Sequence, residues 1–224
     1  MRIRIDVVLA TILFGGSLYV PWGLPSHGTA DRSRVPPRQA NAARADDEPS
    51  YAYVGSFQCK KCHLNEYKSW EATRMAHSFN ILKPEEHKDA KEKFKIDSHK
   101  DYTTHASCLK CHTTGFERQG GYAIPDVNDE KAMKKATRLV GVGCESCHGP
   151  GSAYIEVFEE IMKSKRKYSV EELYAVGLTR IDETTCTACH NQDGPTYDPN
   201  APFDYEKRKR DGVHELRPLK QREQ

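Results

Sequence analysis

The sequence predicts a mostly α-helical chain in which short helices are separated by long loops, with few or no strands. Apolar residues recur near helical spacing in several short segments, and no run alternates apolar and polar residues well enough for a half-buried strand. Only 37% of the 224 residues are hydrophobic, and the mean hydropathy is −0.77. Side-chain packing alone therefore supplies little core, and we expect another component to fill it.

Residues 1–45 are interpreted as a secretory signal peptide with a long Pro/Arg-rich c-region. A basic start precedes the apolar run Val7–Val20, and Ala43-Arg44-Ala45 has the small-residue pattern of a cleavage site. The alternative is an uncleaved membrane anchor, although Gly15, Gly16 and Pro21 interrupt a run that needs about 20 apolar residues to span a bilayer. We expect residues 46–224 to form one domain that is periplasmic or otherwise exported, and membrane-associated only if the N-terminus stays uncleaved.

The helices expected in residues 46–224 are short and carry recognisable start and stop signals. They are Leu64–Ala76, a charged segment from Pro84 to Lys95, Asp129–Leu139 capped by Asn128, a helix capped by Ser152 that carries Tyr154, Ile155, Phe158, Ile161 and Met162, a helix that starts with the Ser169/Glu172 capping box and stops near Gly177, and Tyr205–Arg210 capped by Asp204. Residues 220–224 are expected to fray.

The charge balance gives no indication of nucleic-acid binding. The whole chain has 34 Lys and Arg against 32 Asp and Glu, a net charge of +2. Beyond residue 45 the count becomes 28 basic against 30 acidic residues. Nucleic-acid binding is typically indicated by a clear excess of basic residues, which this balance does not show.

All eight cysteines belong to one repeated motif, Cys-x-x-Cys-His, which is the attachment signature of c-type haem. In each copy the two thiols bond covalently to the porphyrin and the histidine is the proximal iron ligand. The sequence thus predicts four covalently bound c-type haems. The cysteines are Cys59, Cys62, Cys108, Cys111, Cys144, Cys147, Cys186 and Cys189, and the proximal ligands are His63, His112, His148 and His190.

Other uses of paired cysteines fit this pattern poorly. Zinc ribbons place two Cys-x-x-Cys pairs about 15–20 residues apart, whereas the gaps here are 45, 32 and 38 residues. A disulfide framework would leave the four histidines unexplained, and a thioredoxin-like motif would occur once. Four haems also account for the low apolar content, because porphyrins supply the missing apolar surface.

The second axial ligand of each iron decides what that haem can do: a histidine or methionine closes the iron for electron transfer, and an open position binds a small molecule. Beyond the motifs and residue 45, the spare donors are His77, His87, His99, His105, His214, Met75, Met133 and Met162.

Several strings outside the four motifs resemble the tetrahaem cytochrome c-554 family. They are Lys100-Asp101-Tyr102-Thr103, Gly115-Phe116, Gly120-Gly121-Tyr122 and, most distinctive, Gly141-Val142-Gly143-Cys144-Glu145-Ser146-Cys147-His148-Gly149-Pro150-Gly151. The resemblance runs from about Tyr53 to His214. It implies an electron carrier in ammonia oxidation that accepts electrons from a hydroxylamine oxidoreductase-like donor.

The resemblance also implies some distal ligands. His77 matches the distal histidine of the third haem, at His148, and His214 matches the late histidine that closes the fourth haem. The second haem, at His112, matches a five-coordinate position.

One position departs from the family pattern. The family's distal histidine to the first haem lies about ten residues past the third motif, near Phe158 here, and no histidine occurs between His148 and His190. Met162, His99 and His105 are the remaining candidate ligands for that iron, and an open iron is the alternative.

The sequence therefore favours a periplasmic tetrahaem cytochrome that passes electrons between a redox-protein donor and a membrane quinone or cytochrome acceptor, rather than an enzyme. The alternative is a reductase of nitric oxide, nitrite or hydroxylamine at a five-coordinate haem. Against that alternative, no motif replaces the proximal histidine with lysine, as dedicated catalytic haems do. A relay subunit of a larger respiratory assembly is a third reading.

Overall fold

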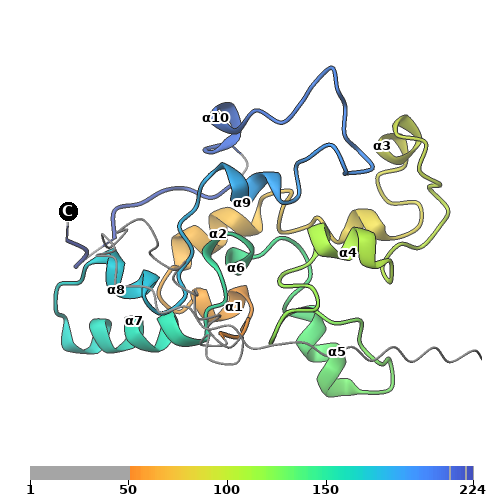
Figure 1. Ribbon diagram of the computed structural model, residues 1–224. Helices are drawn as coiled ribbons and strands as arrows, with labels where there is room; N and C mark the ends of the chain where they lie inside the picture. Colours follow the sequence, from red (N-terminus) through yellow and green to blue (C-terminus); the bar gives the residue numbers. More distant parts are fainter. Residues whose placement is uncertain (1–50, 212, 220, 224) are drawn as a thin grey trace, which may run out of the picture. The chain divides into compact units, whose positions relative to one another are not determined.

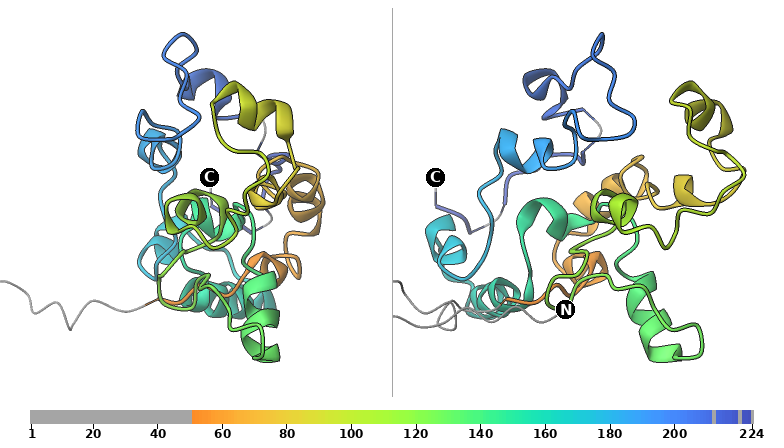
Figure 2. Two further views of the ribbon diagram at one scale, coloured as in Figure 1. Left: turned by 90° about the vertical axis from the view of Figure 1, so that its right-hand side faces the viewer. Right: turned by 45° about the vertical axis from the view of Figure 1, so that its right-hand side comes forward.

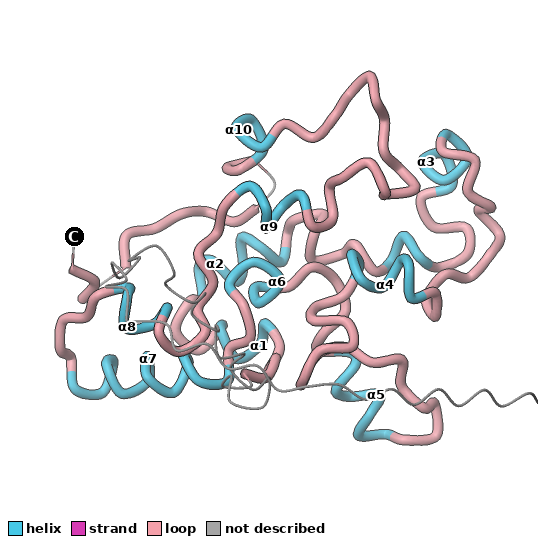
Figure 3. Tube along the Cα trace, in the orientation of Figure 1, coloured by secondary structure: helices cyan, strands magenta, loops and turns pink. Residues whose placement is uncertain are grey.

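The computed structural model describes residues 51–211, 213–219 and 221–223, which belong to one compact unit that starts at Glu48. The predicted signal peptide and its cleavage site lie outside these residues. Within them the chain forms short helices joined by long loops and no strand, as Figure 3 shows. The fold class predicted from the sequence is confirmed. No helix in this part of the chain is long and apolar enough to cross a membrane.

The elements follow one another as short helical turns along the chain (Figure 1). In order they are α1 (Ser56–Cys59), α2 (Leu64–Glu71), the 3-10 turn η1 (Asn80–Leu82), α3 (Lys88–Lys93), α4 (Ala106–His112), α5 (Glu130–Thr137), α6 (Cys144–His148), α7 (Ser152–Ser164), α8 (Val170–Tyr174), α9 (Glu183–Thr187) and α10 (Tyr205–Arg208). Two isolated backbone bridges, Thr113 with Val140 and Tyr168 with Arg222, are the β-type pairs of the described residues.

The N-terminal caps confirm part of the helix analysis and correct part of it. The Ser169/Glu172 capping box begins α8, and Asp204 caps α10, as the sequence predicts. The cap of α5 is Asp129, whose carboxylate accepts the amides of Lys131 and Ala132, and not Asn128. The carboxylate of Asp129, one residue after Asn128, is better placed to accept the first amides of the helix, which have no partner within it.

Three other boundaries also differ from the prediction. Helix α2 ends at Glu71 instead of Ala76, because Thr73 Oγ1 donates to the carbonyl of Trp70 and closes the turn there. Ser152 lies inside α7, and its hydroxyl instead accepts the amide of Ala52. Helix α3 starts at Lys88 and not at Pro84.

The C-terminal residues are not frayed throughout. The amide of Tyr168 donates to the carbonyl of Gln221 at 3.1 Å, and the amide of Glu223 donates to the carbonyl of Tyr168 at 2.9 Å. These long-range bonds hold the described end of the chain against the segment between α7 and α8.

The buried apolar side chains form two small clusters rather than one large core. The first contains Leu82, Leu109, Tyr122, Ala136 and Leu139. The second contains Tyr154, Ile161, Tyr168 and Leu173, between α7 and α8. Figure 2 shows that the helices outside these clusters, such as α3 and α10, are joined to the rest by long loops. This limited packing agrees with the sequence prediction that cofactors complete the core.

A buried carboxylate joins the start of the described chain to the centre of the unit. Glu145, in α6, is 1% exposed, and its oxygens accept the amides of Val54 at 2.9 Å, Gly55 at 2.7 Å and Gly151 at 2.7 Å. Burial raises the pKa of Glu145, and the bonds from the three amides oppose that rise. The carboxylate thereby fixes the segment before α1 and the start of α7 to the same point.

Replacing Glu145 with alanine should destabilise the holoprotein strongly. Each buried amide left without a partner costs about 1–3 kcal/mol, so three amides predict a loss of at least about 3 kcal/mol in the free energy of unfolding. Urea unfolding of the haem-loaded variant measures the loss. Glu156→Ala, which removes an exposed glutamate of α7, is the control, and equal stabilities of the two variants would contradict this role of Glu145.

Candidate functional site

The four Cys-x-x-Cys-His motifs lie on four short helical turns. The second and third motifs lie within α4 and α6. The first starts at the end of α1 and the fourth within α9, and in both the histidine amide donates to the carbonyl of the first cysteine at 2.9 Å. All eight cysteines are free thiols. The motif therefore places the thiols and the histidine of each copy on one compact turn, as the attachment chemistry requires.

Long-range hydrogen bonds connect the motifs to one another. Ser56 of α1 accepts the amide of Cys144 at 3.0 Å, so it caps α6 from a distant part of the chain. Thr114, just after the second motif, accepts the amide of Gly143 at 2.9 Å. Gly143 has no room for a side chain, since a Cβ there would lie 2.5 Å from the Ser56 hydroxyl. The first three motifs are thus fixed around the start of α6, beside which α1 packs (Figure 1).

Cysteines of different motifs influence one another's pKa. The neighbouring Cys59 lowers the pKa of Cys144 to about 7. The neighbouring Cys189 likewise lowers the pKa of Cys111 to about 6. Cysteines of the first and third motifs are therefore neighbours, and so are those of the second and fourth.

Burial keeps the four motif histidines neutral. It is the largest cause of a lowered pKa at His63, His112, His148 and His190. The shift is greatest at His148, whose pKa falls to about 4 through burial and the nearby His214 and His63. A histidine ligates a metal only in its neutral form, so these environments suit iron ligands.

In His112 and His214, hydrogen bonding leaves one ring nitrogen of each side chain available to bind a metal. Nδ1 of His112 lies 2.7 Å from the carbonyl oxygen of Ser78, and Nδ1 of His214 lies 2.7 Å from that of Glu215. A carbonyl only accepts, so Nδ1 carries the proton in both rings and Nε2 keeps its lone pair. Such a bond from the outer nitrogen is the usual support of a metal-binding histidine.

The structure brings His214 to the third motif. The rings of His148 and His214 face each other with centres 6.3 Å apart and an angle of 26° between their planes. The amide of Glu215, which donates to the Ser69 hydroxyl at 2.9 Å, holds this segment against α2.

The ligand set that the family resemblance implies stays a prediction beside this placement. The resemblance assigns His214 to the fourth motif, whereas the ring stacked on His190 is that of Phe203, at 4.6 Å and 12°. The resemblance assigns His77 to the third motif, but His77 is exposed on the loop after α2. It lines a hollow of about 470 Å³ with Phe57, Tyr67 and Trp70.

The weaker candidate ligands of the first haem are scattered. His99 is 71% exposed and contacts Glu85. The ring of His105 lies edge-on against Tyr102, just before α4. Met162 is 39% exposed on α7. The ring that faces His63 is that of Phe158, at 5.5 Å and 27°.

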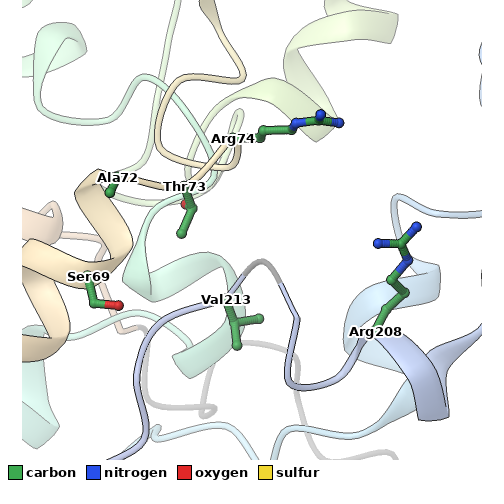
Figure 4. A pocket seen from close by; sticks show the side chains of 6 residues that line it. All are labelled: Ser69, Ala72, Thr73, Arg74, Arg208 and Val213. Carbon is green, nitrogen blue, oxygen red and sulfur yellow. The ribbon is translucent and has the colours of Figure 1, made fainter.

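A cationic hollow lies beside the segment that carries His214. Its volume is about 580 Å³, and its lining includes Arg74, Arg208 and Val213. Figure 4 shows the guanidinium groups of Arg74 and Arg208 on opposite sides of open space, with Val213 below them. Guanidinium groups bind carboxylates well, so this hollow suits the propionate groups of a haem.

The comparisons with known proteins agree with this geometry. The family described as cytochrome c554 and c-prime matches residues 58–149, which hold the first three motifs. Cytochrome c-554 of Nitrosomonas europaea is 38% identical over 160 residues, which cover 67% of this chain and 63% of that protein's length. The solved structure of reduced cytochrome c554 from the same organism matches with a TM-score of 0.67 and 29% identity, over 78% of this chain and 91% of that one.

The chain belongs to the cytochrome c-554 family. The resemblance drawn from the sequence is confirmed, and so is the cofactor, four covalently bound c-type haems. The residues fit that cofactor, since each motif offers two free thiols and a neutral histidine on one turn.

Sequence reasoning missed Glu145, Arg74 and Arg208. The Gly-Pro-Gly string after the third motif could have indicated the role of Glu145. Segments of backbone that approach closely leave amides without partners, and a nearby carboxylate can accept them. Nothing local pointed to the two arginines, which a distant loop brings together.

Removing His214 should open one iron of the oxidised holoprotein. His214→Ala deletes the ring that faces His148, so one low-spin haem should become high-spin. Electron paramagnetic resonance counts both populations. His87→Ala, which removes an exposed histidine assigned to no haem, is the matched control and should leave the spectrum unchanged. An unaltered spectrum for His214→Ala would exclude this residue as a ligand.

Proposed function

We propose that this chain is an exported, periplasmic electron carrier that passes electrons from a redox-protein donor to a redox-protein acceptor or a membrane quinone. The observation that carries the proposal is the hydrogen-bond network around the third motif, where Ser56 accepts the amide of Cys144 at 3.0 Å and Thr114 accepts that of Gly143 at 2.9 Å. Haems attached to motifs held together in this way would be near neighbours. When bound, the four haems supply one-electron redox chemistry at closely spaced centres.

The protein's part in this function is to hold and tune those centres. His63, His112, His148 and His190 would be the proximal ligands, and His214 the distal ligand opposite His148. The bond from His112 Nδ1 to the Ser78 carbonyl would make the other ring nitrogen more basic, and so would favour the oxidised state of an iron that it held. The two arginines of the cationic hollow would offset the charge of haem propionates nearby.

Several parts of the proposal rest on the family alone. Cytochrome c-554 of Nitrosomonas europaea comes from an ammonia-oxidising bacterium. A hydroxylamine oxidoreductase-like donor and a place in the oxidation of nitrogen compounds follow for this chain by that likeness. Export is supported by the apolar run at Val7–Val20 and by the haem attachment motifs themselves. His77 stays a proposed distal ligand on the strength of the resemblance.

An electron-transfer experiment tests the carrier function directly. The fully reduced holoprotein should transfer four electrons, one from each haem, to an excess of an oxidised one-electron cytochrome in a stopped-flow spectrometer. Nitrite or hydroxylamine supplied with a continuous reductant should not be turned over. Sustained consumption of either compound would reject the carrier in favour of a reductase.

The contact between the motifs also predicts a coupling between haems. Oxidised haems in near contact interact magnetically, so the electron paramagnetic resonance signals of the holoprotein should differ from a sum of four isolated haems. A spectrum that is the simple sum of four independent centres would contradict the paired arrangement.

A further inference from the structure

The hydroxyl of Tyr168 is buried and has no hydrogen-bond partner in the described part of the chain. The residue is only 1% exposed and belongs to the second apolar cluster, between α7 and α8. A buried tyrosine hydroxyl ordinarily bonds to a protein group or to an ordered water, because its burial without a partner costs free energy. Tyr154 of the same cluster follows that rule, since its hydroxyl donates to the carbonyl of Gly149 at 3.1 Å. The Tyr168 hydroxyl therefore indicates a partner outside the described polypeptide.

The C-terminal segment brings a cation to the same tyrosine. Tyr168 and Arg222 pair in a parallel backbone bridge, in which the amide of Tyr168 donates to the Gln221 carbonyl at 3.1 Å and the amide of Glu223 donates to the Tyr168 carbonyl at 2.9 Å. Residues paired in such a bridge carry their side chains on the same side of the backbone. Burial raises the pKa of Tyr168, and the charge of Arg222 opposes that rise. A phenol hydroxyl and a guanidinium group together form a donor set that suits a carboxylate.

Two ring contacts connect this donor set to the first haem-attachment motif. Tyr168 packs edge-on against Phe158 at 5.7 Å and 85°, and Phe158 stacks on His63 at 5.5 Å and 27°. Each haem carries two propionate carboxylates at the edge of its porphyrin, away from the iron. A haem attached beside His63 can therefore reach side chains that the imidazole itself does not contact. Its propionates are the nearest source of a carboxylate that the described residues do not supply to this hydroxyl.

We propose that the Tyr168 hydroxyl donates a hydrogen bond to a propionate of the haem attached at Cys59 and Cys62, and that Arg222 pairs with the same carboxylate. Both residues lie beyond 58–149, the range that the family model matches. The end of the chain thus becomes part of the binding site of the first haem. This inference rests on haem attachment at the first motif and goes beyond the proposed carrier function, whose partners and direction of electron flow it does not use.

Tyr168→Phe in the haem-loaded protein tests this inference. Loss of the hydroxyl leaves more negative charge on the propionate, which favours the oxidised iron, so one of the four midpoint reduction potentials should fall. Spectroelectrochemical titration measures this shift, and the urea midpoint of unfolding should fall with it. Arg222→Gln should lower the same potential. Tyr174→Phe, which changes a partly exposed tyrosine of α8 whose ring contacts Arg180, is the control and should move no potential.

The opposite results would overturn the proposal. If the hydroxyl has no partner in the holoprotein or bonds only to a buried water, all four potentials of Tyr168→Phe will equal those of the wild type. Removal of an unpartnered polar group would also leave the variant as stable as the wild type or more stable. A loss of stability with unchanged potentials would show a role in packing alone and would overturn the proposal too.

Two further measurements keep the test decisive. Each variant should carry four haems per chain, so that a shifted potential does not come from a lost haem. If Tyr168→Phe does not fold, Arg222→Gln changes an exposed side chain and carries the same test of potential. Failure of the proposed carrier function would appear instead as sustained turnover of nitrite or hydroxylamine by the wild type in the stopped-flow assay.

Discussion

The bonds of the Glu145 carboxylate are the constraint on which the arrangement of the motifs depends. Glu145 lies inside the third motif, and it fixes the amides of Val54 and Gly55 before α1 and that of Gly151 before α7. Because α1 leads directly into the first motif, this one side chain sets the first motif against the third. The bond from the Cys144 amide to the Ser56 hydroxyl of α1, at 3.0 Å, joins the same two motifs. A buried charge of this kind is tolerated because several amides share it.

Glycines at close backbone contacts and backbone hydrogen bonds also fix the positions of the second and third motifs. Gly141 adopts a φ of +79°, and a Cβ there would lie 2.3 Å from the carbonyl of Ala76. Its amide donates to the carbonyl of His112 at 3.0 Å, and the amide of Thr179 donates to that of His148 at 2.9 Å. Each histidine of these two motifs thus anchors a later segment of the chain. The backbone network compensates for the small apolar clusters and leaves the remaining interior to the cofactors.

The sequence predicted what local chemistry decides and missed what distant segments decide. The four motifs, the capping box at Ser169 and the cap at Asp204 depend on residues within a few positions of one another, and the structure has all of them. The cap of α6 is supplied by Ser56, 88 residues away, and no local pattern indicates it. The partner of His214 likewise depends on how a C-terminal loop returns to Ser69 of α2.

Helix α7 connects the stability of the unit to the chemistry of the first motif. Its start is held by Glu145, and its apolar face forms the second cluster with Tyr168 and Leu173. Phe158 projects from that same helix toward His63. The backbone of Tyr168 is itself bonded to Gln221 and Glu223 at the end of the chain. The ring stacked on His63 is therefore set by packing between three segments rather than by the first Cys-x-x-Cys-His motif itself. A change in that packing would alter the ligand environment of His63 without altering any residue of the Cys-x-x-Cys-His motif.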